Sequence, residues 1–265
     1  MVNSGPVAQD DSLLVRPRAD EEGTAHSRDV AIAWRRYGSG SATVLVMPTW
    51  NFVDSRVVRR QIDGLRDRFR VIAFDPRGSG ESGRPTEGYG FGDHAADAVA
   101  VLDATGTPSA ALVAASRGSH SAVLLATRQP ERVQKLVLIA PAIDVPTDTQ
   151  TAREETEGAE GSEPSWRTDY ANFVPWFIER CFPEPGSERT IADISAIALE
   201  ADHRMLLQEA DEEDWDEAPR QLQDVTCPTL VIHGVDDVFV DPELHRHVVL
   251  CCVPGVGFEP TTSAL

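Results

Sequence analysis

The sequence feature that most constrains the fold is an alternation of short apolar runs with longer segments of helical periodicity. The apolar runs are rich in Val, Ile, Leu and Ala, and from residue 43 onward nearly every position in them is apolar. Such continuity is typical of strands buried on both faces of a sheet. The expected strands are Val30–Trp34, Thr43–Met47, Arg70–Phe74, Ala110–Ala114, Lys135–Ile139 and Thr229–Ile232, and the expected helices between them are Ser55–Asp67, Asp93–Ala104 and Ser119–Arg128. This order predicts an α/β fold with a mostly parallel central sheet and helices on both faces.

The alternation stops between residues 147 and 222, where the pattern becomes helical and acidic. Residues 151–165 are polar and low in complexity, which is typical of a flexible excursion. Apolar side chains then recur at helical spacing from Phe173 to Cys181, and a second helical segment follows at residues 191–207. We therefore predict a helical cap over residues 147–222, inserted into the α/β core.

Composition excludes several functions. The net charge is −19, from 43 acidic against 24 basic residues, so nucleic acid is not an expected partner. No apolar run is long enough for a membrane span, and the N-terminus lacks the pattern of a signal peptide. The four cysteines form no CxxC pair and no framework spacing, which favours reduced thiols and a cytoplasmic protein. We expect no metal and no cofactor.

The stretch "VAASRGSH" places Ser116 between an expected strand and an expected helix. A tight strand–turn–helix of this kind holds a serine in a strained conformation that projects its hydroxyl group as a nucleophile. Small side chains two positions before and two after make room for the turn, and here they are Ala114 and Gly118. The alternative interpretation of Ser116 is an N-cap on the following helix.

A nucleophilic serine needs backbone donors for the oxyanion that forms when it attacks a carbonyl. The N–H of Arg117 is the first candidate. The second is expected in the loop "PTWNF" after the Thr43–Met47 strand, where Pro48 has no N–H. Trp50 is therefore the first choice and Thr49 the second. The alternative interpretation of Trp50 is a pocket wall or core residue.

A catalytic acid is expected at the same edge of the sheet as Ser116, because ligands bind at the carboxyl ends of parallel strands. The last expected strand runs into "HGVDDVFV", where Asp237 is the first choice and Asp236 is its neighbour in reserve. Asp144, after the Lys135–Ile139 strand, is a further possible position. The alternative for the two adjacent aspartates is a polar turn.

Together these pieces resemble the α/β-hydrolase fold family, over about Val30 to Pro242. The matching segments are "VLVMPTW", "FDPRGSGESGRP", "LVAASRGS", "ATRQPERVQKLVLIAP" and "CPTLVIHGVDD", in that order. The resemblance implies Ser116 as nucleophile, Asp237 as acid, and a histidine in a Gly-His turn after one more strand. It also implies that Asp75 and Arg77 brace a turn and take no part in the chemistry.

The sequence departs from the family at the histidine. No histidine follows His247, and His245 and His247 come too soon after Asp237 to stand beyond another strand. Composition also changes abruptly after Val248, which predicts an aberrant or truncated end. Of the others, His120 is expected to be a buried structural residue on a helix facing the sheet, His94 to reach the rim of the site, His233 to point into the core and His203 to lie in the cap. The triad histidine is therefore taken as missing.

The expected division of the chain is a flexible tail over residues 1–28, core over 29–146, cap over 147–222, core again over 223–248 and an aberrant tail over 249–265.

The resulting functional prediction is a serine hydrolase for an ester or related acyl substrate, impaired because the triad histidine is missing. Cap aromatics are expected to line an apolar acyl pocket, and the acidity of the cap disfavours anionic substrates. The pocket residues are Trp50, Phe173, Trp176 and Phe177. The alternatives are a catalytically inactive protein that binds a small apolar ligand, and a truncated product that does not fold stably.

Overall fold

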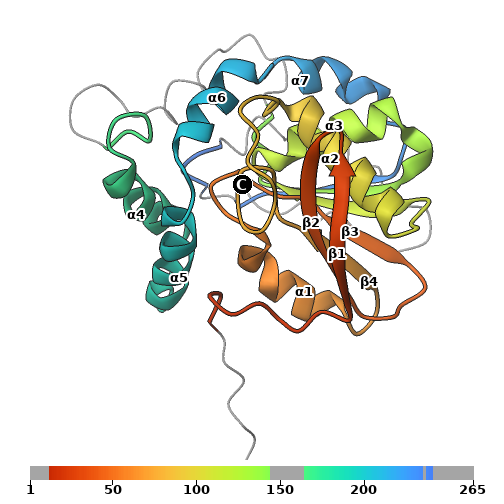
Figure 1. The fold of residues 1–265 in the computed structure, drawn as a ribbon, viewed down its shortest axis with the longest axis horizontal. Helices are drawn as coiled ribbons and strands as arrows, with labels where there is room; N and C mark the ends of the chain where they lie inside the picture. The colour runs from red at the N-terminus through yellow and green to blue at the C-terminus, as the bar shows by residue number, and fades with distance from the viewer. Residues whose placement is uncertain (1–11, 144–163, 235–236, 241–265) are drawn as a thin grey trace, which may run out of the picture.

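The computed structural model describes residues 12–143, 164–234 and 237–240. Its centre is a seven-stranded sheet in the order β1-β2-β4-β3-β5-β6-β7 (Figure 1). The strands are β1 (Glu21–Ser27), β2 (Val30–Tyr37), β3 (Thr43–Val46), β4 (Arg70–Phe74), β5 (Ala110–Ala115), β6 (Val133–Ile139) and β7 (Thr229–Ile232). β1 and β2 pair antiparallel with their neighbours, and all pairings from β4 to β7 are parallel. The predicted α/β class with a mostly parallel sheet is confirmed.

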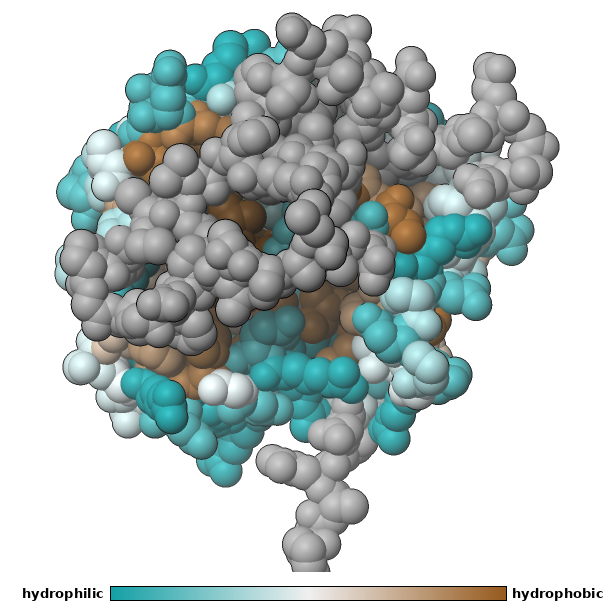
Figure 2. Space-filling model, turned by 180° about the vertical axis from the view of Figure 1, so that it is seen from behind, coloured by the Kyte–Doolittle hydropathy of each residue, from teal (hydrophilic) through white to brown (hydrophobic). Residues whose placement is uncertain are grey.

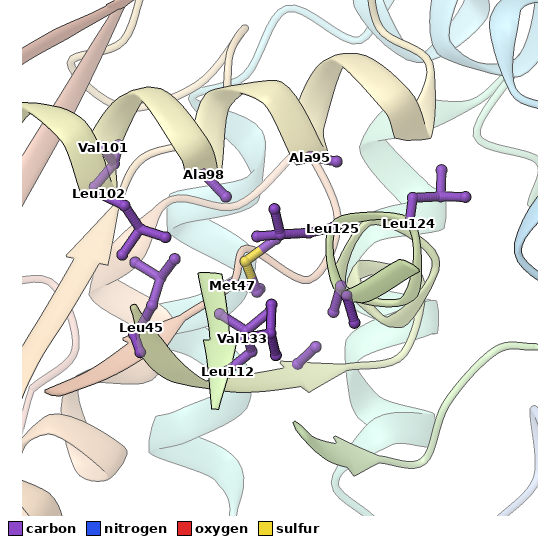
Figure 3. Close-up of a cluster of buried hydrophobic side chains, with 14 of the residues drawn as sticks. Leu45, Met47, Ala95, Ala98, Val101, Leu102, Leu112, Leu124, Leu125 and Val133 are labelled. Carbon is purple, nitrogen blue, oxygen red and sulfur yellow. The ribbon is translucent and has the colours of Figure 1, made fainter. Parts of the chain in front are cut away.

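Helices cover both faces of this sheet because successive strand residues point to opposite sides. On one face, Ile62 of α1 (Arg59–Leu65) packs with Val44, Val71 and their neighbours. On the other face lie α2 (Phe91–Ala104) and α3 (Gly118–Arg128). Figure 3 shows Ala98 and Leu102 of α2 and Leu125 of α3 pointing toward Leu45, Met47 and Leu112. This core fixes the ends of β3 and β5, where the candidate site is built.

The N-terminal part of the chain differs from its prediction as a flexible tail. Residues 21–27 form β1, which pairs along its whole length with β2. Its sequence, EEGTAHS, is polar and buries only Ala25 and Ser27, so it carries no apolar run that would mark a strand. Upstream, Ser12 and Leu13 are buried, and both donate hydrogen bonds to Asp193 of the cap, at 2.9 and 2.7 Å. Within residues 12–28 the predicted tail is therefore wrong.

The chain after residue 164 is helical, in the region where the sequence predicts a cap. The helices are α4 (Tyr170–Cys181), α5 (Glu188–Leu199), α6 (Arg204–Glu212) and α7 (Glu217–Gln221). The first three share one apolar cluster with Trp50 and Phe52, which belong to the loop after β3. By contrast, Ala218 of α7 packs in the core cluster with α3, so this helix belongs to the core although the prediction put it in the cap. In Figure 1, α4 and α5 stand beside the sheet, while α6 and α7 run along its upper edge.

The single helical segment expected over 191–207 is two helices. The chain turns between Leu199 and Arg204, where the Asp202 side chain accepts a hydrogen bond from the Arg204 N–H at 3.1 Å. Aspartate competes with a helix in this way because its short side chain bonds backbone groups two residues on. The break lets α6 turn across the loop after β3.

None of the described helices is both long and apolar enough to cross a bilayer. From behind, apolar surface reaches the outside among hydrophilic side chains (Figure 2), and β7 carries exposed Leu230 and Ile232. The candidate acids Asp144 and Asp236, His245, His247, the segment 151–163 and the tail 249–265 lie outside the described residues.

Candidate active site at the turn between β5 and α3

Ser116 occupies the turn between β5 and α3 in a left-handed conformation, with φ 51°. A non-glycine residue in this region costs of order 1–3 kcal/mol and persists only where its surroundings enforce it. Here the Ser116 N–H donates to Ile139 O at 3.0 Å, and its carbonyl accepts from Ser119 N at 3.0 Å and Ala142 N at 3.2 Å. The alternative N-cap role does not hold, because Arg117 occupies the N-cap position and no side chain caps α3.

Gly118 brings the loop after β3 against the first turn of α3. A Cβ placed on Gly118 would lie 2.1 Å from the Pro48 carbonyl oxygen, far inside van der Waals contact. Two positions before the serine, Ala114 is fully buried. The small residues on either side of Ser116 therefore serve close packing, and Gly118 does so by letting two backbones meet.

The two predicted oxyanion donors lie on either side of this contact. Within the described ranges, the backbone N–H groups of Trp50 and Arg117 donate no hydrogen bond, and neither does that of Thr49. The Trp50 indole is 7% exposed and packs edge-on against Phe52 at 4.7 Å and Phe177 at 5.5 Å. Its side chain is thus part of a buried apolar cluster, and its backbone N–H has no hydrogen-bond acceptor among the described residues.

The four predicted pocket residues form one aromatic cluster between the loop after β3 and α4. Phe173 stacks on Phe177 with ring centroids 5.3 Å apart, and its ring lies 6.2 Å from that of Trp50. Trp176 lies at the border of the cluster, 6.0 Å from Phe173. A fifth ring that sequence reasoning missed, Phe239, lies 4.8 Å from Phe177. It follows the predicted acid by two residues, and only the tertiary contact shows its place.

Asp237 stands in the turn after β7. One carboxylate oxygen accepts hydrogen bonds from the N–H groups of Phe239 and Val240, at 2.9 and 3.0 Å. The other lies 3.2 Å from Nε2 of His233, which also lies 3.1 Å from the Val240 carbonyl oxygen. The local contacts of Asp237 are therefore those of a residue in a polar turn. His233 contacts this turn, whereas the sequence analysis expected it to point into the core.

The other histidines have structural surroundings. His120 is fully buried and stacks on Phe91, with ring centroids 4.2 Å apart. Its ring also lies 5.0 Å from that of Trp215, and its Nε2 lies 2.6 Å from the Ala142 carbonyl oxygen just beyond β6, so the predicted buried structural role is confirmed. His94 contacts the Asn51 amide at 3.0 Å, and burial lowers its pKa to about 3. His203 stacks on Tyr170 in the cap. Among the described residues, no side chain hydrogen-bonds the Ser116 hydroxyl group.

A buried charged cluster adjoins Ser116 that the sequence did not suggest. The Arg117 guanidinium lies between the Trp50 and Trp215 rings, 4.5 Å from each centroid. It pairs closely with Glu213 and lies 3.9 Å from Glu209, both at the C-terminal end of α6 or just beyond it. Burial raises the pKa of both carboxyls, that of Glu213 to about 9, and Arg117 opposes the shift. Burial therefore favours the protonated form of these carboxyls, and the Arg117 guanidinium favours the charged form.

The raised pKa of Glu213 predicts a pH-dependent stability. Its folded value of about 9 lies above the ordinary 4.5, so the folded state binds this proton more tightly than the unfolded chain. The free energy of unfolding therefore falls as pH rises across that window. Glutamine cannot ionise, so the Tm of E213Q minus the Tm of wild type should increase as the pH rises from about 5 to about 8. Exposed Asp211→Asn is the control, and a Tm difference for E213Q that is independent of pH would contradict the shift.

The contacts of the "DPRGSGES" segment agree with the bracing role that the family resemblance implied. Asp75 is fully buried and accepts hydrogen bonds from Arg16, at 3.0 Å, and from Ser55. Burial alone would raise the pKa of Asp75, but Arg16 and these hydrogen bonds hold it below its usual range. Arg77 forms a two-bond pair with Asp97 of α2, with Nε to Oδ2 at 2.8 Å. Among the described residues, no group of His, Cys, Asp or Glu side chains could hold a metal ion.

The model of the alpha/beta hydrolase fold family matches residues 44–180, just over half of the chain, and the chain belongs to this family. Among its relatives is 3-oxoadipate enol-lactonase 2 from Acinetobacter baylyi. The two are 28% identical over 226 residues, which cover 81% of this chain and 79% of that protein. Its relatives therefore include hydrolases of small molecules.

Solved structures that share this fold are named for different activities. An esterase from Exiguobacterium antarcticum superposes with a TM-score of 0.73 at 22% identity, covering 84% of this chain and 85% of that one. A bromoperoxidase from Bacillus anthracis gives a TM-score of 0.71 at 22% identity, with the same coverage. At this identity the likeness establishes the fold, and the reaction has to be argued from the site.

Proposed function

We propose that the protein is a serine hydrolase that cleaves a neutral ester or a related acyl bond, such as a lactone. The observation that carries the proposal is Ser116 at φ 51° at the carboxyl end of a central strand. Such strain is typical of a nucleophilic serine exposed on a sharp turn. The lactonase among the relatives supports an acyl substrate, because its name places the same reaction class on a related chain.

In the proposed reaction, the Ser116 hydroxyl oxygen attacks the substrate carbonyl and forms a tetrahedral adduct. The backbone N–H groups of Trp50 and Arg117 donate to the oxyanion. The adduct collapses with loss of the alcohol, and water then cleaves the acyl-enzyme. Both steps require a base to take a proton, and Asp237 is the proposed acid that would orient a histidine. His233 at 3.2 Å is the described histidine that contacts it.

The proposed activity is slow, because no described histidine hydrogen-bonds Ser116 to take its proton. Loss of one triad member in studied hydrolases leaves about 10³–10⁴-fold catalysis over water, supplied by the oxyanion hole and binding. The aromatic cluster of Trp50, Phe173, Trp176, Phe177 and Phe239 supports an apolar acyl group. The net charge of −19 disfavours anionic substrates, and the cysteine pattern supports a cytoplasmic site of action.

The proposal is tested by steady-state hydrolysis of p-nitrophenyl butyrate and of p-nitrophenyl hemisuccinate, a similar ester that carries a negative charge. We expect the neutral ester to be hydrolysed above the enzyme-free rate, and kcat/KM for the anionic ester to be about tenfold or more lower. A fluorophosphonate should inhibit the reaction. Rates equal to the enzyme-free rate for both esters, with reversible binding of the neutral one, would favour the inactive ligand-binding protein.

A further inference from the structure

Glu209 of the cap helix α6 contacts both residues whose N–H groups are the proposed oxyanion donors. Its carboxylate accepts a hydrogen bond from the Trp50 indole Nε1–H at 3.0 Å. The same side chain lies 3.9 Å from the Arg117 guanidinium. Glu209 is 3% exposed, so these contacts are made away from water, where a hydrogen bond is stronger than at the surface.

The Arg117 side chain is held on three sides. Two tryptophan rings, of Trp50 and Trp215, lie 4.5 Å from its guanidinium carbon on either side. Glu213 pairs with its Nη2. Cations between aromatic faces are stabilised by about 0.5–2 kcal/mol for each contact, depending on exposure. A side chain fixed in this way restrains the backbone at its own residue, and that backbone carries the N–H next to Ser116.

We propose that Glu209 is a positioning residue for the oxyanion hole, holding the loop after β3 and the turn at Ser116 in the spacing that lets the Trp50 and Arg117 N–H groups meet one oxygen. This inference rests on the proposed function. It is consistent with the site geometry, because the two residues come from segments that meet at the Gly118–Pro48 backbone contact and where the Arg117 guanidinium lies over the Trp50 ring. Oxyanion donors act when they are fixed before the charge develops, and this requires supporting residues of their own.

A purely structural role would be to hold the cap on the core, but other contacts already do that. Glu212 accepts hydrogen bonds from the N–H groups of Gly88 and Tyr89, at 2.8 and 2.6 Å. The aromatic side chains of α4 pack directly on Trp50 and Phe52. The N-terminal segment joins α5 through Asp193. Loss of the Glu209 carboxylate therefore leaves the cap attached and removes one contact from each of the two donor residues.

The experiment compares Glu209→Ala with Glu209→Gln and with Asp211→Ala, an exposed acid on the same helix. E209A is expected to lower kcat for p-nitrophenyl butyrate about tenfold and to leave KM within about twofold, because donor alignment acts on the transition state. E209Q should stay within about threefold of wild type, since its amide oxygen still accepts from the Trp50 indole. D211A should match wild type. Equal kcat values for E209A and D211A would overturn the inference.

A double-mutant cycle shows whether Glu209 acts through Trp50. Trp50→Phe removes the indole donor and keeps an aromatic wall. If the carboxylate works through that donor, the E209A effect on kcat should shrink by at least about half in the W50F background, since coupled residues are not additive. An undiminished tenfold effect would show that Glu209 affects kcat independently of the Trp50 indole, and would contradict the proposal that it positions Trp50.

A measurement without turnover keeps this inference separate from the proposed function. Hydrogen–deuterium exchange is followed in peptides that cover residues 48–52 and 115–118. E209A should raise deuterium uptake in both peptides relative to wild type and D211A, because their amides lose a fixed environment. Unchanged uptake would contradict the positioning role even if the protein hydrolyses esters. Failure of the proposed function appears elsewhere, as wild-type turnover that equals the enzyme-free rate.

Discussion

Replacing Ser116 by alanine is expected to abolish the burst of p-nitrophenolate that wild type releases on mixing with p-nitrophenyl butyrate. The wild-type burst should approach about one equivalent per chain, because an acyl-enzyme accumulates when its hydrolysis is slower than its formation. That order is expected for this substrate, since p-nitrophenolate is a good leaving group in the acylation step, whereas hydrolysis of the butyryl ester of Ser116 has no such leaving group. S116A has no oxygen to acylate, and its time course should be linear from the start.

Ser119→Ala is the matched control for this change. Ser119 lies on α3 one turn beyond Ser116 and is fully buried, so both variants remove one hydroxyl group from the same short segment. S119A should retain the burst. Persistence of a full burst in S116A would show that another side chain is acylated and would contradict the nucleophile assignment. Stopped-flow absorbance in the first turnover provides the measurement.

Asp97→Ala is expected to lower the free energy of unfolding by about 3–5 kcal/mol, which is a large part of the stability of a domain. Asp97 is fully buried and Arg77 is 2% exposed, and the two side chains share two hydrogen bonds. Truncating the carboxylate leaves the Arg77 guanidinium buried without its countercharge. A buried charge without a partner costs much more than the intact pair contributes.

Asp103→Ala on the same helix separates this effect from a loss of helix charge. Asp103 is 64% exposed and pairs with Arg132 at 2.7 Å at the surface. Exposed pairs contribute about 0–1 kcal/mol, so D103A should melt close to wild type. Urea unfolding of the three proteins measures the difference. A D97A midpoint within the range of D103A would show that Arg77 finds another partner or reaches water.

The elements that the sequence predicted are those whose pattern is local. All six expected strands are present, because runs such as Thr43–Met47 are apolar at consecutive positions and are buried on both faces. β1 was missed since an edge strand paired on one side does not need apolar residues. The break before α6 depends on one hydrogen bond from Arg204 to Asp202, which periodicity does not register.

The residues of the candidate site, too, were predicted only where they belong to a local sequence pattern. Ser116, Gly118 and the loop at Trp50 were identified because a strained turn needs small neighbours at fixed spacing. Glu209 and Glu213 were not, because they lie in an acidic segment that reads as a solvated surface. Their burial comes from contacts with Trp50 and Arg117, far away in the chain. Only the packing of the cap on the core creates that environment.

The most direct test of the central claim, that Ser116 is the nucleophile, is to map the residue that a fluorophosphonate modifies in the wild-type protein. Intact-mass spectrometry should show a single adduct per chain, and peptide mapping should place it on Ser116. S119A should carry the same adduct, and S116A should carry none. An adduct on another residue, or a wild-type protein that stays unmodified while its far-UV circular dichroism shows it to be folded, would contradict the account.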